Sequence, residues 1–245
     1  MRKLLTDAAR TLVPPRTDRH GPLPPLMLTL TVVTGVVDAV SYLGLGHVFV
    51  ANMTGNVVFL GFALAGAKGL SAVAPVVSLT AFLTGAVAGG RIGVRKAAHR
   101  GRLLAVSTGT QAVLMAAATL IAALARDRVG TGVEYTLIVL LGLGMGLQNA
   151  VARRLGVPDL TTTVLTLTLT GLAADSPPAG GGAPRPGRRM LSVLAMFTGA
   201  LAGAQLVLHG QLAAALAVAW LLLLVTAVTT RRISAPDVHW AAPTA

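Results

Sequence analysis

Residues 26–46 read LMLTLTVVTGVVDAVSYLGLG, an apolar run that contains a single carboxylate, Asp38. A run of about 20 apolar residues is long enough to cross the hydrocarbon core of a lipid bilayer as a helix. A charged side chain at that depth costs at least about 2.5 kcal/mol on insertion scales, and such groups usually face a bundle interior or a solute path. Asp38 therefore predicts a functional site, with a purely structural carboxylate bonded to neighbouring helices as the alternative.

The composition of the whole chain is that of an integral membrane protein. Hydrophobic residues make up 54% of the 245 residues, charged residues make up 11%, and the mean hydropathy is +0.74. The net charge is +12, but the 20 Lys and Arg residues lie almost wholly between or beyond the apolar segments, and only 4% of residues are aromatic. This pattern is typical of charges that anchor cytoplasmic loops, so the expected partner is the lipid bilayer and no nucleic acid is expected.

Eight apolar segments follow one another along the chain, and all are expected to be helical. Six are long enough to cross a bilayer, whereas two of about 15 residues are too short. The segments cover residues 26–46, 53–67, 72–90, 103–125, 133–152, 160–174, 189–208 and 211–230, and the short ones are 53–67 and 160–174. Apolar residues within 4–13 also predict a short helix that lies on the membrane surface.

An internal repeat relates the two halves of the chain. Residues 81–90 read AFLTGAVAGG and residues 195–204 read AMFTGALAGA, with six identities in ten positions at an offset of 114. The first long segment of each half aligns at an offset of 111, which pairs Asp38 with Asn149. The expected organisation is a cytoplasmic tail (1–25), a first membrane repeat (26–125), a second membrane repeat (132–230) and a second cytoplasmic tail (231–245).

The distribution of positive charge predicts the topology. If the two short segments enter the membrane and return on the same side, 17 Lys and Arg lie on one side, and only Lys68, Arg126 and Arg128 lie on the other. Because Lys and Arg collect in cytoplasmic loops, this arrangement is favoured over eight full crossings. Each repeat then crosses three times, so the second is inverted relative to the first, as in many secondary transporters. The predicted fold is an all-α polytopic membrane bundle of two inverted repeats, with six spanning helices and two short re-entrant or half-helices.

Polar residues gather on the first long segment and at the openings of the two short segments. The first turn of a half-helix has free N–H groups and a positive dipole end, which can hold a polar or anionic solute. The candidate substrate-binding or ion-binding residues are Asp38, Ser41, Asn52, Thr54 and Asn56 in the first repeat, and Asn149, Thr162 and Thr166 in the second. The alternatives are hydroxyl hydrogen bonds between helices and ordinary helix N-capping, which explains Asp159 well.

Sequence motifs typical of enzymes and metal sites do not occur in this chain. There is no Cys, no Gly-Lys-Ser/Thr phosphate loop and no Gly-x-Ser-x-Gly elbow, and none of the five His lies at ligand spacing from another. We therefore expect a protein that is not an enzyme and that uses no cofactor and no metal.

Residues 35–56, which read GVVDAVSYLGLGHVFVANMTGN, resemble the signature of the YoaK-like family of bacterial membrane proteins, domain of unknown function 1275. The likeness extends over residues 28–230 and includes the Thr-rich segment 160–174. It implies a multi-pass protein of the bacterial inner (plasma) membrane whose activity is not established. It also implies that Asp38, Asn52, Thr54 and Asn56 are the most characteristic positions, but it supplies no substrate.

These features predict a secondary transporter of a small polar or anionic solute that uses Asp38 for proton or cation coupling. The alternative is a non-transporting membrane scaffold or accessory subunit, whose polar residues only join helices. The expected partners are the lipid bilayer and a small solute or ion, and a homo-oligomer is possible.

Overall fold

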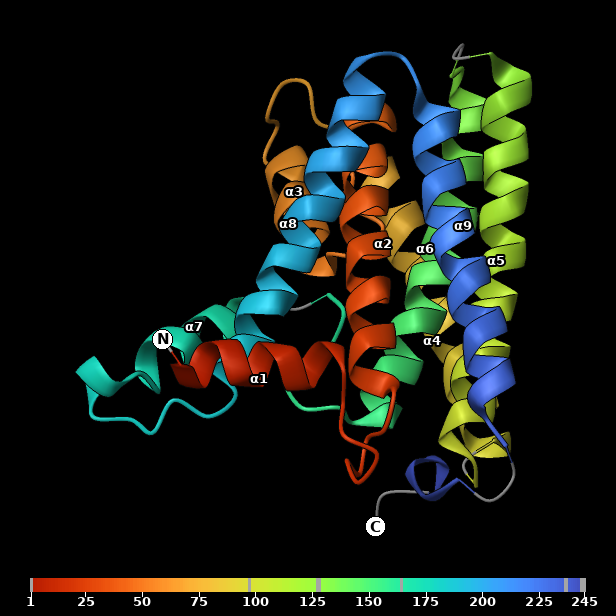
Figure 1. Cartoon of the computed structure of the whole chain (residues 1–245). Coiled ribbons are helices and arrows are strands. Elements are labelled where there is room, and N and C mark those ends of the chain that lie inside the picture. The colour runs from red at the N-terminus through yellow and green to blue at the C-terminus, as the bar shows by residue number, and fades with distance from the viewer. Residues whose placement is uncertain (1, 97, 127–128, 164, 236–237, 243–245) are drawn as a thin grey trace.

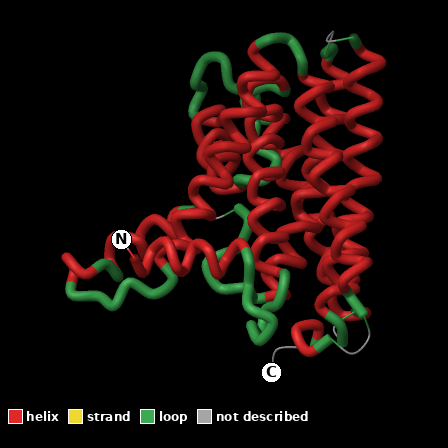
Figure 2. Tube along the Cα trace, in the orientation of Figure 1, coloured by secondary structure: helices red, strands yellow, loops and turns green. Residues whose placement is uncertain are grey.

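The computed structural model describes residues 2–96, 98–126, 129–163, 165–235 and 238–242, which form helices and connecting loops without strands (Figures 1 and 2). Within this part of the chain, six helices are long and apolar enough to cross a membrane. They are α2 (Leu23–Gly44), α4 (Val73–Arg95), α5 (Arg100–Ala125), α6 (Thr131–Leu155), α8 (Pro186–Leu208) and α9 (Leu212–Ile233). The expected polytopic helical membrane bundle is confirmed.

Two further apolar helices are too short to cross a bilayer. α3 (Met53–Leu64) has 12 residues and α7 (Thr166–Ala174) has 9, which correspond to about 18 and 14 Å of helix. The hydrocarbon core is about 30 Å thick. In Figure 1, α3 leads to the end of the bundle at which α4 begins, whereas α7 lies near the opposite end, at which α8 begins. The shorter elements are α1 (Arg2–Leu12), which lies across that opposite end, η1 (Pro177–Ala179) and η2 (His239–Ala241).

Most of the predicted helix boundaries differ from the observed ones by a few residues, including those of the two short segments and the start of α2. The segment predicted at 160–174 becomes helical only at Thr166, and Leu160 is fully buried in the preceding loop. The segment predicted at 53–67 ends at Leu64. α2 begins at Leu23, so residues 23–25 of the predicted tail belong to this helix; its prolines lie in the first turn, where the backbone N–H that proline lacks would have no partner in the helix.

The centre of the bundle is formed by α2 and α6. In these helices 72% and 61% of the apolar stretch is buried, compared with at most 33% in the other four long helices. Large apolar side chains on the outer helices, such as Leu83, Phe197 and Val225, are mostly exposed on the surface of the bundle, as expected for contact with lipid. Polar residues in the middle of these two helices, such as Thr34, Ser41 and Gln148, are therefore buried inside the bundle.

Each central helix packs closely on one outer helix through glycine. α2 packs on α8, where a Cβ on Gly35 would lie 2.3 Å from the backbone oxygen of Met196. α6 packs on α4, where a Cβ on Gly146 would lie 1.9 Å from the backbone oxygen of Phe82. Small residues allow helix backbones in membranes to approach this closely. The two contacts are related by offsets of 111 and 114 residues, the same offsets that relate the two halves of the sequence.

Candidate functional site

The chain folds back beside α2 after this helix ends. The Ala51 N–H donates a hydrogen bond to Asp38 Oδ1 at 3.1 Å, and the N–H groups of Val50 and Asn52 interact with the same carboxylate. Asp38 lies six residues before Gly44, the last residue of α2, which corresponds to about 9 Å along the helix axis. The loop 45–52 therefore returns into the bundle to the depth of Asp38, and three consecutive backbone amides face its carboxylate.

Asn56, in the first turns of α3, holds this loop in place. Its Oδ1 accepts from the Phe49 N–H at 2.9 Å, and its Nδ2 donates to the Phe49 carbonyl oxygen at 2.6 Å and to Ser78 Oγ at 3.1 Å. Ser78 Oγ donates to the same Phe49 oxygen at 2.7 Å, and both polar side chains are fully buried. The amide of Asn56 thus makes its contacts inside the protein and shapes the loop, and it does not line the pocket described below, so solute binding by Asn56 stays a prediction.

Two other candidate residues also lie away from the pocket described below. The Ser41 hydroxyl donates to the backbone oxygen of Asp38 at 3.2 Å, within its own helix. Thr162 Oγ1 is buried and accepts from Gln148 Nε2 at 3.1 Å. Gln148 also donates to Thr34 Oγ1 at 3.0 Å and accepts from Gln111 at 2.9 Å, so this buried group joins α6 to α2 and α5. For Ser41 and Thr162 the alternative of hydrogen bonding within and between helices is the better description.

The remaining five candidate residues line one pocket of about 630 Å³: Asp38, Asn52, Thr54, Asn149 and Thr166. They come from α2, the opening of α3, α6 and the opening of α7. Val58 and Leu169, also in its lining, have exposed fractions of 45% and 50%, so the pocket reaches the surface of the bundle. No Lys, Arg or His from the described residues lines it. The pocket therefore presents one carboxylate among neutral amides and hydroxyls.

Several residues that line the pocket are not among those predicted from the sequence. Thr163 Oγ1 donates to Asn149 Oδ1 at 2.5 Å, while Asn149 Nδ2 donates to the backbone oxygen of Met145 at 2.9 Å. Phe82 from α4 and Met196 from α8 also line the pocket. The sequence does contain a signal for Phe82 and Met196, because each is the second residue of the ten-residue motif that occurs at 81–90 and again at 195–204. Their apolar side chains gave no chemical reason to select them.

Helix capping does not explain the polar residues at the two openings. Asn52 is the N-cap of α3, but its side chain makes no capping hydrogen bond, and it is exposed in the pocket wall. Asp159 is not a cap either, because α7 begins seven residues later. Its carboxylate pairs with Arg185 Nε at 2.6 Å and Arg189 Nε at 3.0 Å. Burial alone would raise the pKa of Asp159, but these two guanidinium groups outweigh it and lower the pKa.

The fold and the pocket define a polytopic membrane protein with a cavity between the openings of two short helices, in which Asp38 and neutral polar groups lie among apolar side chains. The family model described as "Protein of unknown function (DUF1275)" matches residues 26–229, and the chain belongs to this family. It is 36% identical over 152 residues to "UPF0700 transmembrane protein YoaK" of Bacillus subtilis (strain 168). That alignment covers 61% of this chain and 65% of the relative, which is less than two thirds of the relative's length. No solved structure matches the chain.

Proposed function

We propose that this protein is a secondary transporter of a small polar or anionic solute in the bacterial inner (plasma) membrane, and that it is not an enzyme. Asp38 serves as the proton or cation coupling group. The observation that supports this proposal is the shared pocket, in which Asp38 meets the openings of both short helices. Ionisable groups inside membrane proteins are expensive and usually mark solute or proton paths.

The position of Asp38 suggests how coupling works. The first turn of a helix attracts negative charge because its N–H groups are free and its dipole end is positive. The Asp38 carboxylate lies beside the opening of α3, where it faces the backbone amides of residues 50–52, which directly precede the first helical turn. Protonation of Asp38 removes that charge and leaves the amides available to a solute. A proton and an anionic solute would then bind together, and an ionised Asp38 would exclude the anion.

The proposal includes two inverted repeats that move against each other around the pocket, as in other secondary transporters. The support is the reciprocal packing of α2 on α8 and of α6 on α4, with glycine contacts at matching offsets. A second support is the placement of the two short helices, which lead from the pocket toward opposite ends of the bundle (Figure 1). Each half thus contributes one opening to the same cavity.

The first test is a ligand screen. Purified protein in detergent is heated with small metabolites at pH 5.5 and pH 7.5, and a ligand that binds only the folded state raises the apparent melting temperature. A solute that stabilises more strongly at the lower pH is then offered to liposomes that contain the protein. We expect accumulation driven by an inward proton gradient in wild type, and loss of this gradient dependence in Asp38→Asn.

Glu134→Gln is the matched control, because it also neutralises one carboxylate but lies at the start of α6, outside the pocket. It should transport like wild type. If Asp38→Asn still accumulates the solute in response to the gradient, the coupling role is wrong. The hydrogen bond from Ala51 to Asp38 also favours a second candidate, a non-transporting scaffold. In that case Asp38→Asn lowers the melting temperature, and no solute moves in any preparation.

A further inference from the structure

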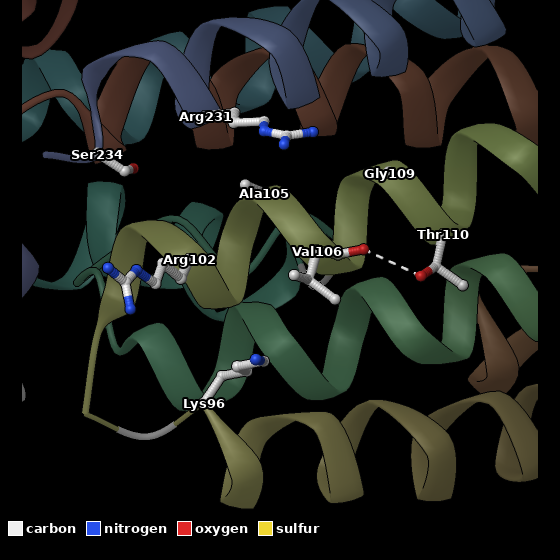
Figure 3. A pocket seen from close by; sticks show the side chains of 8 residues that line it. All are labelled: Lys96, Arg102, Ala105, Val106, Gly109, Thr110, Arg231 and Ser234. Carbon is white, nitrogen blue, oxygen red and sulfur yellow. Dashed lines mark hydrogen bonds between the residues drawn. The ribbon is translucent and has the colours of Figure 1, made fainter. Parts of the chain in front are cut away.

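A second cavity, of about 490 Å³, lies where α4 and α9 end and α5 begins (Figure 3). The long helices separate this cavity from the openings of the two short helices (Figure 1). Three cations from three elements surround it: Lys96 directly after α4, Arg102 in the first turn of α5 and Arg231 near the end of α9. All three are exposed. The transport proposal makes no use of this group.

Within the described part of the chain, neighbouring acids do not balance the charge of this group. The ion pairs found in the described part of the chain involve Arg185 and Arg189, and none involves the three cations of this cleft. No Asp or Glu from the described residues lines the cavity. The Thr110 hydroxyl donates to the Val106 carbonyl oxygen at 3.0 Å (Figure 3), and the Ser234 hydroxyl donates to its own helix at 2.5 Å. The free hydrogen-bond donors are therefore the cationic groups, which match a phosphate.

The cleft continues from these charges along an apolar strip of α5. Ala105, Val106 and Gly109 line it beyond Arg102. From Arg102 to Gly109 is seven residues, or about 10 Å of helix, directed away from the charged end. A Cβ on Gly109 would meet no atom within 4 Å, so the backbone there faces open space. A free phosphate would use only the charged end, whereas a phospholipid would use both parts of the cleft.

We propose that this cleft binds an anionic phospholipid, with the phosphate between Lys96, Arg102 and Arg231 and the start of an acyl chain along the α5 strip. Basic pockets between membrane helices at the charged side of a membrane protein are suited to anionic headgroups. The location supports a lipid source, because α4, α5 and α9 are all spanning helices and the cleft lies where they leave the apolar region. This site is independent of the transport proposal.

The test measures the melting temperature of the full chain in detergent as dioleoyl phosphatidylglycerol is added. Dioleoyl phosphatidylcholine and glycerol 3-phosphate are the comparison ligands. We expect phosphatidylglycerol to stabilise at a concentration at least tenfold lower than phosphatidylcholine, and glycerol 3-phosphate to have no effect. The variant K96Q/R102Q/R231Q should lose this preference. The control R91Q/R95Q/R153Q removes the same net charge from exposed residues outside the cleft and should retain it.

Gly109→Leu is a second variant that fills the apolar strip without changing any charge. It should weaken phosphatidylglycerol binding at least fivefold while the protein without lipid melts as wild type does. The proposal is overturned if glycerol 3-phosphate reproduces the stabilisation, since the ligand would then be a soluble phosphate compound. It is also overturned if the control triple variant loses as much affinity as the cleft variant, or if Gly109→Leu has no effect.

Discussion

Asn52 and Asn56 are separated by one helical turn, but the structure uses their amides differently. Asn56 is fully buried and bonds both backbone groups of Phe49, whereas Asn52 is exposed in the pocket wall and leaves its capping position unused. A buried amide with these partners costs stability when removed, because donors and acceptors of the loop lose their contacts. An exposed amide with no such contacts is available to a solute. Asn52 and Asn56 therefore allow the same substitution to be compared at an exposed amide and at a buried one.

Asn56→Ala should lower the free energy of unfolding by about 2–3 kcal/mol, because the Phe49 N–H, which is partly buried, is left without its partner. Asn52→Ala should leave stability within about 0.5 kcal/mol of wild type and should weaken solute binding instead. Unfolding in mixed detergent micelles measures the first effect, and the melting-temperature shift with the ligand found in the screen measures the second. Equal losses of stability in both variants would contradict the separate roles.

His20, which lies outside the membrane-spanning helices, makes the stability of the fold sensitive to acid. Its side chain is 4% exposed, and both ring nitrogens lie within 3.1 Å of guanidinium nitrogens, from Arg19 and Arg100. Burial, followed by the charges of Arg100 and Arg19, lowers the pKa of His20 to about 4, although Asp18 acts in the opposite direction. The folded state therefore resists the proton that the unfolded chain accepts near pH 6.5.

This shift predicts that stability falls as the pH decreases from about 6.5 to about 4, because the unfolded state binds more protons in that range. The slope from this group is at most about 1.4 kcal/mol per pH unit. His20→Gln should flatten the curve of melting temperature against pH below 6.5. The exposed His209, changed to Gln, is the control and should leave the curve unchanged. An unaltered acid slope in His20→Gln would show that other groups determine it.

Among the elements, the six long helices were predictable from sequence because a bilayer demands long apolar runs. The start of α7 was not, although residues 160–165 are rich in Leu and Thr. The backbone at Thr162 and Thr163 is not helical, and tertiary contacts hold it in place, because Gln148 and Asn149 of α6 bond the hydroxyls of these two residues. Such long-range hydrogen bonds leave no local pattern. For the same reason Asn56 could be selected as important, but its structural role could not be distinguished from binding.

Helix α4 offers a direct test of how closely the elements pack. A Cβ on Gly85 would lie 2.1 Å from the backbone oxygen of Leu143 on α6, whereas one on Gly90, in the same helix, would meet nothing within 4 Å. Gly85→Ala should destabilise the protein by about 1–3 kcal/mol, because two backbones must separate. Gly90→Ala should be neutral or slightly stabilising. Unfolding in mixed micelles compares the two, and equal effects would exclude close α4 to α6 packing.

At the scale of the whole molecule, charge and helix length point to the same topology. Lys68 lies in the loop between α3 and α4, and Arg126 lies directly after α5, at one end of the bundle (Figure 1). Arg128, the third residue predicted on this side, lies outside the described residues. The ends of α4, α6 and α9 that carry basic residues in their last turns lie at the other end. Because basic residues favour the cytoplasmic side, that other end should face the cytoplasm.

The chain has no cysteine, so single cysteines can test this orientation without background. Ala67 and Ala98 are both exposed, and they precede and follow α4. Six crossings with a cytoplasmic N-terminus place residue 67 outside and residue 98 inside, whereas eight crossings reverse both. In intact cells, a membrane-impermeant maleimide should therefore label Ala67→Cys at once and label Ala98→Cys only after permeabilisation. Solubilised protein, in which both sites must react, is the control. The reverse labelling would contradict six crossings with a cytoplasmic N-terminus. It would mean either that the whole bundle is inverted or that α3 forms part of a full crossing, and in the second case the pocket would lose the re-entrant opening on which its chemistry depends.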